Sequence, residues 1–295
     1  MKLILLELNE INFDVVKYYI DKGISLPAMN HVLESGLINT SAESEYDNLE
    51  PWIQWVSVHT GKEYNEHNVF RLGDFVNSKE EQFFEKVEKA GFNVGAISPM
   101  NAANRLKNPS YFIPDPWTQT KTDKSFLSRI IAESLAQSVN DNSQSRLTVK
   151  TILSLILAFF IMVNPKKYFF MLKYAFQALG KPWRKALFLD MFLYEIHKTL
   201  FKNKKPNFST LFLNAGAHIQ HHYFFNSPYV NSKVLKNPDW YIDKNEDPIL
   251  EMLVVYDRLI GDLIKNSETE LIIATGLSQK TFTRLKFYYR LKDHK

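Results

Sequence analysis

Short apolar segments alternate with helical patterns along most of this chain, and that alternation limits the fold more than any other feature. The first segment, residues 3–8, is largely apolar on both faces, as expected of a strand buried in a parallel sheet. Similar segments recur at residues 92–97, 207–214 and 271–274. Strands that alternate with helices predict an α/β fold built on a mostly parallel sheet.

Cap and turn residues indicate where the helices lie. One helix is predicted between Asn12 or Asp14, as its cap, and Gly23. A second begins at Pro27 and ends at Gly36, the positions that proline and glycine favour in helices. Further helices are predicted at residues 79–90 and 248–265.

Composition divides the chain into three parts. Residues 1–124 are predicted to form the N-terminal part of the α/β core, which ends in a loop at 98–124 rich in Asn, Pro, Ser and Thr. Residues 125–205 lack the strand–helix alternation, and we expect a helical, basic and aromatic insertion that is a cap or a membrane-surface element. Residues 206–295 are predicted to form the C-terminal part of the α/β core.

The formal net charge of +4 is the sum of two opposed parts. Residues 146–205 hold 12 Lys and Arg against two acids, a charge of +10, and the rest holds 24 against 30, a charge of −6. A basic segment in an acidic body indicates an anionic partner. We expect a phosphorylated or other anionic small molecule or a lipid headgroup, with peripheral membrane contact through 146–205. Nucleic acid is not expected, because no recognised binding module accompanies the charge.

The apolar run at residues 152–163 leaves three interpretations open. It is about a dozen residues long, whereas a spanning helix needs about 20, and Asn164 and Pro165 end it. A buried core helix is the simplest interpretation. An interfacial helix pair is favoured by the aromatic residues interleaved with Lys and Arg in 168–185, and a spanning helix is the third.

Cysteine is absent, which excludes disulfides, zinc–cysteine sites, iron–sulfur clusters and a thiol nucleophile. Any metal must be bound by imidazole, carboxylate or amide groups. The N-terminal apolar run is too short for a signal peptide and lacks a small-residue cleavage site. We therefore expect a cytoplasmic protein that is peripheral at the membrane.

Polar residues gather where the first strand ends. Glu7 and Asn9 share one face of that strand, and Glu10 faces the other way. Ligands bind at the carboxyl ends of strands in open α/β sheets. Oxygen atoms there suit a hard cation, so Asn9 and Glu10 are candidate metal ligands. A solvated or capping pair is the alternative.

A second cluster begins at Glu50, which precedes Pro51 at a helix start, where a negative charge is favoured. Glu50 is a candidate catalytic base or metal ligand. Two tryptophans three positions apart can wall a pocket, although the same spacing fits core packing. The candidate substrate-binding residues are Trp52, Gln54, Trp55, His67 and Arg71.

Three histidines within five residues follow the strand at 207–214. Imidazoles bind transition metals or relay protons. We expect His218 to be catalytic and His221 and His222 to be metal ligands. The spacing is not that of a zincin helix, because no Glu follows His218.

Four segments occur in an order typical of one enzyme superfamily. They are the strand and turn at 5–14, an LPNL…L…G-like helix at 26–36, a PAWxSxxTG…EHG-like segment with Trp55, Ser57, Thr60, Gly61, Glu66 and His67, and a D…G-like helix with Val255, Tyr256, Asp257 and Gly261. Together they resemble the alkaline phosphatase superfamily, in its type I phosphodiesterase/nucleotide pyrophosphatase-like branch. The resemblance covers most of the chain outside 98–205.

The resemblance implies a three-layer sandwich and two divalent metals, usually zinc, that clamp a phosphoryl group while Thr or Ser attacks phosphorus. Most implied metal-ligand positions are substituted here. The family's opening Asp falls on Asn9, and its nucleophile falls near Glu50. The other ligand positions fall on Ala217, His221, residues 275–278 and His294, of which only the histidines match. Because the family's sheet continues further, a chain shortened at its C-terminus is also implied.

Two functions are consistent with these residues. The first is a hydrolase or transferase of a phosphate or sulfate ester, at a membrane surface, with a rewired site and a divalent cation such as zinc, manganese or magnesium. The second is a non-catalytic relative that keeps the fold as a binding module for anionic lipid or glycan and holds no metal.

Overall fold

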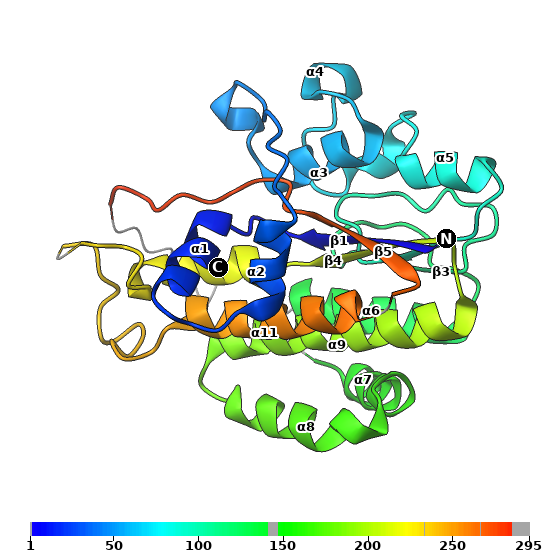
Figure 1. The fold of residues 1–295 in the computed structure, drawn as a ribbon. Helices are drawn as coiled ribbons and strands as arrows, with labels where there is room; N and C mark the ends of the chain where they lie inside the picture. Colours follow the sequence, from blue (N-terminus) through cyan, green and yellow to red (C-terminus); the bar gives the residue numbers. More distant parts are fainter. Residues whose placement is uncertain (1, 141–146, 233, 266, 285–295) are drawn as a thin grey trace, which may run out of the picture.

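The computed structural model describes residues 2–140, 147–232, 234–265 and 267–284, so Arg146 and His294 lie outside the described residues. The described strands form one sheet in the order β3-β2-β4-β1-β5, and every neighbouring pair is parallel (Figure 1). The strands are β1 (Lys2–Leu8), β2 (Val94–Ile97), β3 (Tyr111–Ile113), β4 (Phe208–Leu213) and β5 (Thr269–Ala274). The predicted α/β fold with a parallel sheet is confirmed.

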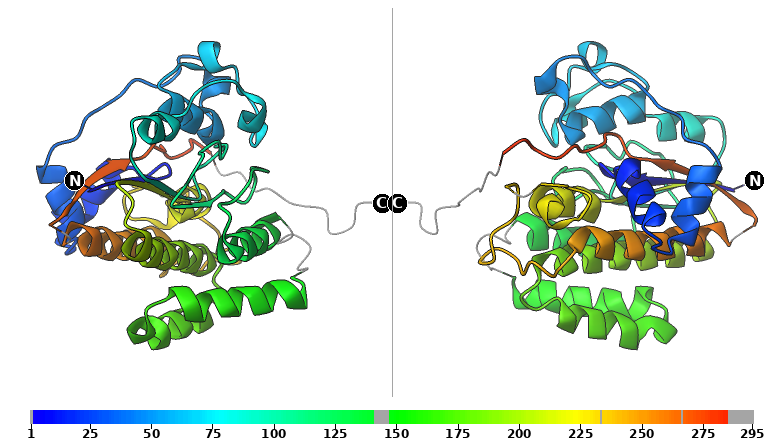
Figure 2. Two further views of the ribbon diagram at one scale, coloured as in Figure 1. Left: turned by 90° about the vertical axis from the view of Figure 1, so that its right-hand side faces the viewer. Right: turned by 60° about the vertical axis from the view of Figure 1, so that its left-hand side comes forward.

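Helices cover both faces of the sheet and complete a three-layer α/β sandwich (Figures 1 and 2). One face carries α3 (Pro51–Thr60), α4 (Tyr64–His67) and α5 (Phe83–Lys89). The opposite face carries α6 (Phe126–Asn140), α9 (Pro182–Lys204) and α11 (Pro248–Ile264). Because α9 contacts both β2 and β4, it is part of the sandwich itself.

Three further helices lie near the carboxyl ends of the strands. They are α1 (Phe13–Asp21), α2 (Pro27–Glu34) and α10 (Ala215–Tyr223). Of the two predicted caps of the first helix, Asn12 is the one used, and its Oδ1 accepts a hydrogen bond from the backbone N–H of Asp14 at 2.8 Å. Single turns of 3₁₀ helix are η1 (Tyr46–Asn48), η2 (Asp74–Asn77), η4 (Pro165–Lys167) and η5 (Phe224–Asn226).

Helices α7 (Val149–Met162) and α8 (Tyr168–Gln177) form an additional outer layer on the far side of α9 from the sheet (Figures 1 and 2). Among the described residues, no single helix has both the length and the hydropathy needed to cross a membrane. Helices α7 and α8 meet those criteria only as a pair, and the chain bends by 114° between them.

Strand β3 lies in the segment 98–124, which we predicted to be loop, so that prediction is wrong for these residues. The strand has only three residues, too few to show a repeating pattern. Its place depends on a fit to distant residues. The Tyr111 ring covers Gly95, where an added Cβ would lie 2.3 Å from the ring Cζ, and its hydroxyl lies 2.6 Å from Ser209 Oγ.

Strand β1 is buried on both faces, as its apolar sequence predicts. Leu6 and Leu8 belong to the main core between the sheet and α9, α10 and α11. Leu3 and Leu5 pack on the other face, against the cluster around Phe84 of α5. Polar side chains begin directly after this strand, at the edge of the sheet where β4 also ends.

Candidate functional site

Asn9 joins the ends of two neighbouring strands to helix α3. Leu8 pairs with Leu213 across β1 and β4, so Asn9 and Asn214 follow them side by side. The Asn9 side chain donates from Nδ2 to Asn214 Oδ1 at 2.8 Å and accepts at Oδ1 from Trp55 Nε1 at 2.7 Å. Both atoms of this buried amide group therefore already have protein partners.

Trp55 is fully buried and is held on both sides. Its indole ring packs edge-to-face on Phe212 with ring centroids 5.3 Å apart. The turn after β5 crosses the ring at Gly276, where an added Cβ would lie 2.8 Å from Trp55 Cε2. Trp55 therefore fixes the start of α3 and the turn after β5 against the sheet.

Glu10 occupies a strained position at the same edge. Its backbone φ is 60°, a left-handed value that costs a residue with a side chain about 1–3 kcal/mol. Its N–H donates to Thr275 O at 2.9 Å, and its carbonyl accepts from Gln220 Nε2 at 2.7 Å. Its Oε2 accepts from Gln279 and lies 3.3 Å from His221 Nε2.

The two glutamines that hold Glu10 were not among the residues predicted from the sequence. They lie 210 and 269 positions away along the chain. No local pattern marks either glutamine, and only the parallel sheet brings them to Glu10.

Glu50 lies at the N-cap of α3, with its carboxylate largely exposed and free of a capping hydrogen bond. Partial burial raises the pKa of Glu50, the negative charge of Glu10 raises it further, and His221 lowers it. Glu10, Glu50 and His221 are therefore close enough to influence one another electrostatically. All three are candidate site residues from the sequence.

The three histidines lie on one face of α10, which begins directly after β4. The rings of His218 and His222 are tilted by 51° with centroids 4.6 Å apart, and His222 Nδ1 lies 2.6 Å from Tyr241 Oη. Burial, followed by the charges of His222 and His221, lowers the pKa of His218 to about 4. Burial and His221 also lower the pKa of His222. His218 is therefore neutral at neutral pH, which suits a base or a ligand better than an acid.

A buried network fixes the first turn of α10, and with it the histidine face. Asp190 accepts from the backbone N–H of Ala215 at 2.8 Å and from the hydroxyl of Tyr256 at 2.6 Å. The same hydroxyl accepts from the N–H of Gly216 at 2.9 Å. Burial raises the pKa of Asp190 to about 6.

Three predicted substrate-binding residues form side-chain hydrogen bonds to other parts of the protein. Trp52 Nε1 donates to Phe70 O at 3.0 Å, and Gln54 Nε2 donates to Asn48 O at 2.9 Å. His67 accepts at Nδ1 from the N–H of Val69 and donates from Nε2 to Ser57 Oγ at 3.1 Å. Burial lowers the pKa of His67, consistent with this neutral form.

Arg71 is exposed, and its guanidinium forms no ion pair or hydrogen bond within the described part of the chain. The loop that carries it is fixed by Asn101, whose side chain donates to the carbonyls of Trp52 and Arg71 and accepts from the N–H of Gly73. Asn101 is itself held by the buried carboxylate of Asp115 at 2.7 Å. Neither residue was predicted to contribute to the site.

Glu7 lies inside the sheet rather than at its edge. Its Oε1 accepts from Thr210 Oγ1 at 2.6 Å and lies 3.2 Å from His59 Nε2, and both side chains are at most 1% exposed. Among the described residues, Glu7 Oε2 and His59 Nδ1 have no hydrogen-bond partner. Glu7 therefore does not share the surroundings of Asn9 and Glu10.

Comparison with protein-family models, with curated proteins and with solved structures gave no match to this chain. Inferences about function therefore rest on the geometry and chemistry of its own residues.

Proposed function

We propose that this protein is a hydrolase or transferase of a phosphate or sulfate ester, of the alkaline phosphatase superfamily and its type I phosphodiesterase/nucleotide pyrophosphatase-like branch. The observation that carries the proposal is the proximity of Glu10, Glu50 and His221 at the carboxyl edge of a parallel sheet. Ligands of open α/β folds bind at that edge. A carboxyl group whose pKa is raised by burial and a neighbouring charge is also a candidate for acid–base catalysis.

In this proposal Glu50 is the general base. It is exposed at the start of α3, where a substrate can reach it, and its raised pKa makes its carboxylate a stronger base. Glu10 acts through its Oε2, which lies 3.3 Å from His221 Nε2 and orients that ring. The His221 side chain is 61% exposed and can contact the ester oxygens.

The two-metal clamp implied by the resemblance does not fit these residues. Asn9 stands at an implied carboxylate position, and both of its amide atoms bond to Asn214 and Trp55. Within the described ranges, no group of three or more His, Asp and Glu side chains is close enough to hold a metal ion. No step of the proposed chemistry is therefore routed through a metal.

A binding module without catalysis is the second candidate function. It is favoured by the hydrogen bonds that the side chains of Asn9, Trp52, Gln54 and His67 form within the protein. Its ligand would be an anionic lipid or glycan.

Turnover of aryl phosphate monoesters, aryl phosphate diesters and aryl sulfates by the wild type and by Glu50→Gln tests the first candidate. The assays are run with a chelator and with zinc, manganese or magnesium. We expect Glu50→Gln to lower kcat/KM about 100-fold or more, the usual contribution of a general base. Glu45→Gln, on the same exposed loop, is the matched control and should keep wild-type activity. Turnover that Glu50→Gln leaves unchanged, or no wild-type turnover under any condition, rejects the hydrolase and leaves the binding module.

A further inference from the structure

Helix α7 is apolar on the face that it turns to solvent. Six of its residues are between 43% and 59% exposed and recur at helical spacing, namely Ile152, Leu153, Ile156, Leu157, Phe160 and Ile161. Its inner face is also mostly apolar, with Ala158, Phe159 and Met162 buried. A surface helix normally carries polar residues outward, and a helix that is apolar all round is found in a core or in a membrane.

Helix α8 continues this apolar surface. Phe169 and Phe176 are 82% and 75% exposed, and Phe170 and Leu172 are 43% and 52% exposed. Both helices contact α9 on their inner side and form one outer layer, which both views of Figure 2 show. Their open faces therefore point the same way. We call these ten exposed apolar residues the outer α7–α8 surface.

The segment that forms α7 and α8 carries charges of one sign only. No acidic residue occurs between positions 147 and 189 of the sequence. Lys167 and Lys181 form ion pairs with Glu195 and Glu246. Lys166 and Lys173 are exposed and have no ion pair among the described residues. An apolar face bordered by unpaired lysines matches an anionic lipid surface, which offers both hydrocarbon and negative headgroups.

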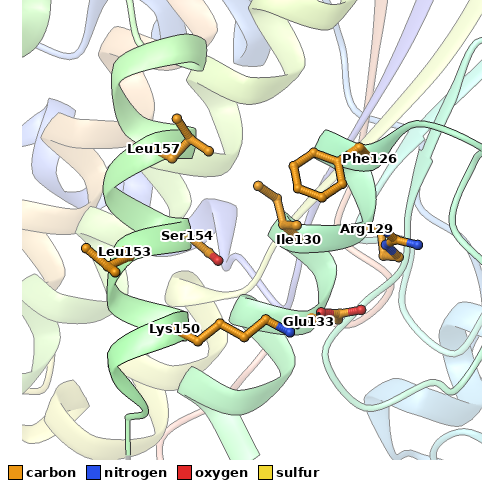
Figure 3. Close-up of a pocket in the computed structure, with 8 residues that line it drawn as sticks. All are labelled: Phe126, Arg129, Ile130, Glu133, Lys150, Leu153, Ser154 and Leu157. Carbon is orange, nitrogen blue, oxygen red and sulfur yellow. Dashed lines mark ion pairs between the residues drawn. The ribbon is translucent and has the colours of Figure 1, made fainter.

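A pocket of about 600 Å³ between α6 and α7 extends this surface (Figure 3). Leu153 and Leu157 line the pocket and also belong to the outer α7–α8 surface. Phe126, on the α6 side, is 63% exposed. Lys150 lies 3.7 Å from Glu133 at its rim. The apolar area therefore continues beyond the two helices onto α6.

We propose that the outer α7–α8 surface docks on the anionic leaflet of a lipid bilayer. The apolar side chains enter the interface between headgroups and acyl chains, and Lys166 and Lys173 contact the headgroups. Because the chain bends by 114° between them, the two helices lie together in one layer. This arrangement suits a protein that lies on a membrane rather than one that crosses it. The proposal concerns a different surface from Glu50 and holds for either candidate function.

Flotation of the full chain with vesicles of phosphatidylcholine, with or without phosphatidylglycerol, tests the proposal. We expect binding to the anionic vesicles that weakens as salt is raised. Phe169→Glu with Phe176→Glu should abolish binding, because two charges would have to enter the interface. Lys166→Gln with Lys173→Gln should lower the affinity about 25-fold, about fivefold for each lysine removed.

The matched controls change exposed residues elsewhere. Ile38→Glu, at a side chain 93% exposed, and Lys107→Gln with Lys236→Gln should bind as the wild type does. Circular dichroism checks that every variant is folded. Binding that the phenylalanine variant retains, or that ignores both lipid charge and salt, overturns the proposal. A dimer that this variant disrupts, with no vesicle binding, assigns the surface to a second copy of the chain. Wild-type protein that only detergent releases from vesicles assigns α7 and α8 to a membrane crossing.

Discussion

Glu10 combines a strained backbone with a carbonyl oxygen and a carboxylate oxygen, Oε2, that both contact other residues. Its φ of 60° persists because Thr275 and Gln220 bond to its main chain and because Gln279 and His221 engage its side chain. Non-glycine residues in this region of backbone space often lie at functional sites. The strained backbone directs the Glu10 carboxylate toward α10, whereas an extended backbone would direct it elsewhere.

Because Glu10 and His221 act on the pKa of Glu50 in opposite directions, we expect opposite pH shifts when each is replaced. The pKa of Glu50 is raised by burial and then by Glu10, and it is lowered by His221. Glu10→Gln removes a raising influence, so the acidic limb of the kcat/KM profile should move to lower pH. His221→Gln removes a lowering influence, so the same limb should move to higher pH. Profiles recorded on an aryl phosphate or sulfate check both directions, and shifts of the same sign in the two variants would contradict the role of Glu50 as base.

The neighbours of Glu10 show which contacts a sequence can reveal. Asn9, Glu10, Glu50 and His221 could be recognised as candidates, because Asn9 and Glu10 follow a strand, Glu50 begins a helix and His221 belongs to a histidine cluster. The supporting residues Gln220 and Gln279 could not be found, because glutamine has no positional preference that marks a distant partner. The hydrogen bond of the Asn9 amide could not be predicted either, because it depends on the orientation of the Trp55 ring.

Among the elements, the turn after β5 depends on a glycine for two separate reasons. Gly276 has φ +68°, and an added Cβ would lie 2.8 Å from the Trp55 ring. We expect Gly276→Ala to lower the free energy of unfolding by about 3 kcal/mol, the sum of the backbone and overpacking costs. Urea unfolding measures this loss, and near-ultraviolet circular dichroism reports the displacement of the tryptophan.

Gly180→Ala separates those two reasons. Gly180 has φ +77° but nothing within 4 Å of an added Cβ, so only the backbone cost of about 1 kcal/mol remains. Equal losses for the two variants would show that contact with Trp55 is unimportant.

Elements with a recognisable local pattern could be predicted, and β3 could not. The strands β1, β2, β4 and β5 and the helices α1, α2 and α11 follow repeating local patterns that a reader of the sequence can see. Strand β3 has only three residues and depends on the fit of Tyr111 to Gly95. The order of strands in the sheet is likewise set by packing between segments far apart in the chain.

At the scale of the whole molecule, buried ionisable groups give stability a pH dependence. Burial lowers the pKa of His197 to about 3 and helps lower that of His218 to about 4. Between these values and about pH 6.5, the unfolded chain binds protons that the folded chain does not. The contribution of the two neutral histidines to the free energy of unfolding is therefore fully present above about pH 6.5 and is lost as pH falls. Asp190 acts in the opposite direction, because its pKa is raised to about 6 and its contribution is lost as pH rises.

His197→Gln should flatten this dependence. Between pH 7 and pH 5, we expect wild-type stability to fall by about 2 kcal/mol relative to the variant, because His197 must stay neutral while the unfolded histidine charges. Urea unfolding over this range measures the difference. His31→Gln, on the exposed side of α2, is the control and should follow the wild type. The same dependence of unfolding free energy on pH in the wild type and His197→Gln would contradict this role of His197.

The position of β1 between β4 and β5 has a consequence for how the chain is made. β1 ends at Leu8, and its sheet neighbours begin only at Phe208 and Thr269. At about 5–20 residues per second, a ribosome needs roughly 10–40 s to produce the intervening 200 or so residues. Throughout that time β1 has neither of its two sheet neighbours, and its apolar faces require protection from other nascent chains. Glu10 gains Gln279 only after β4 and β5 have been made, so the candidate site is assembled late.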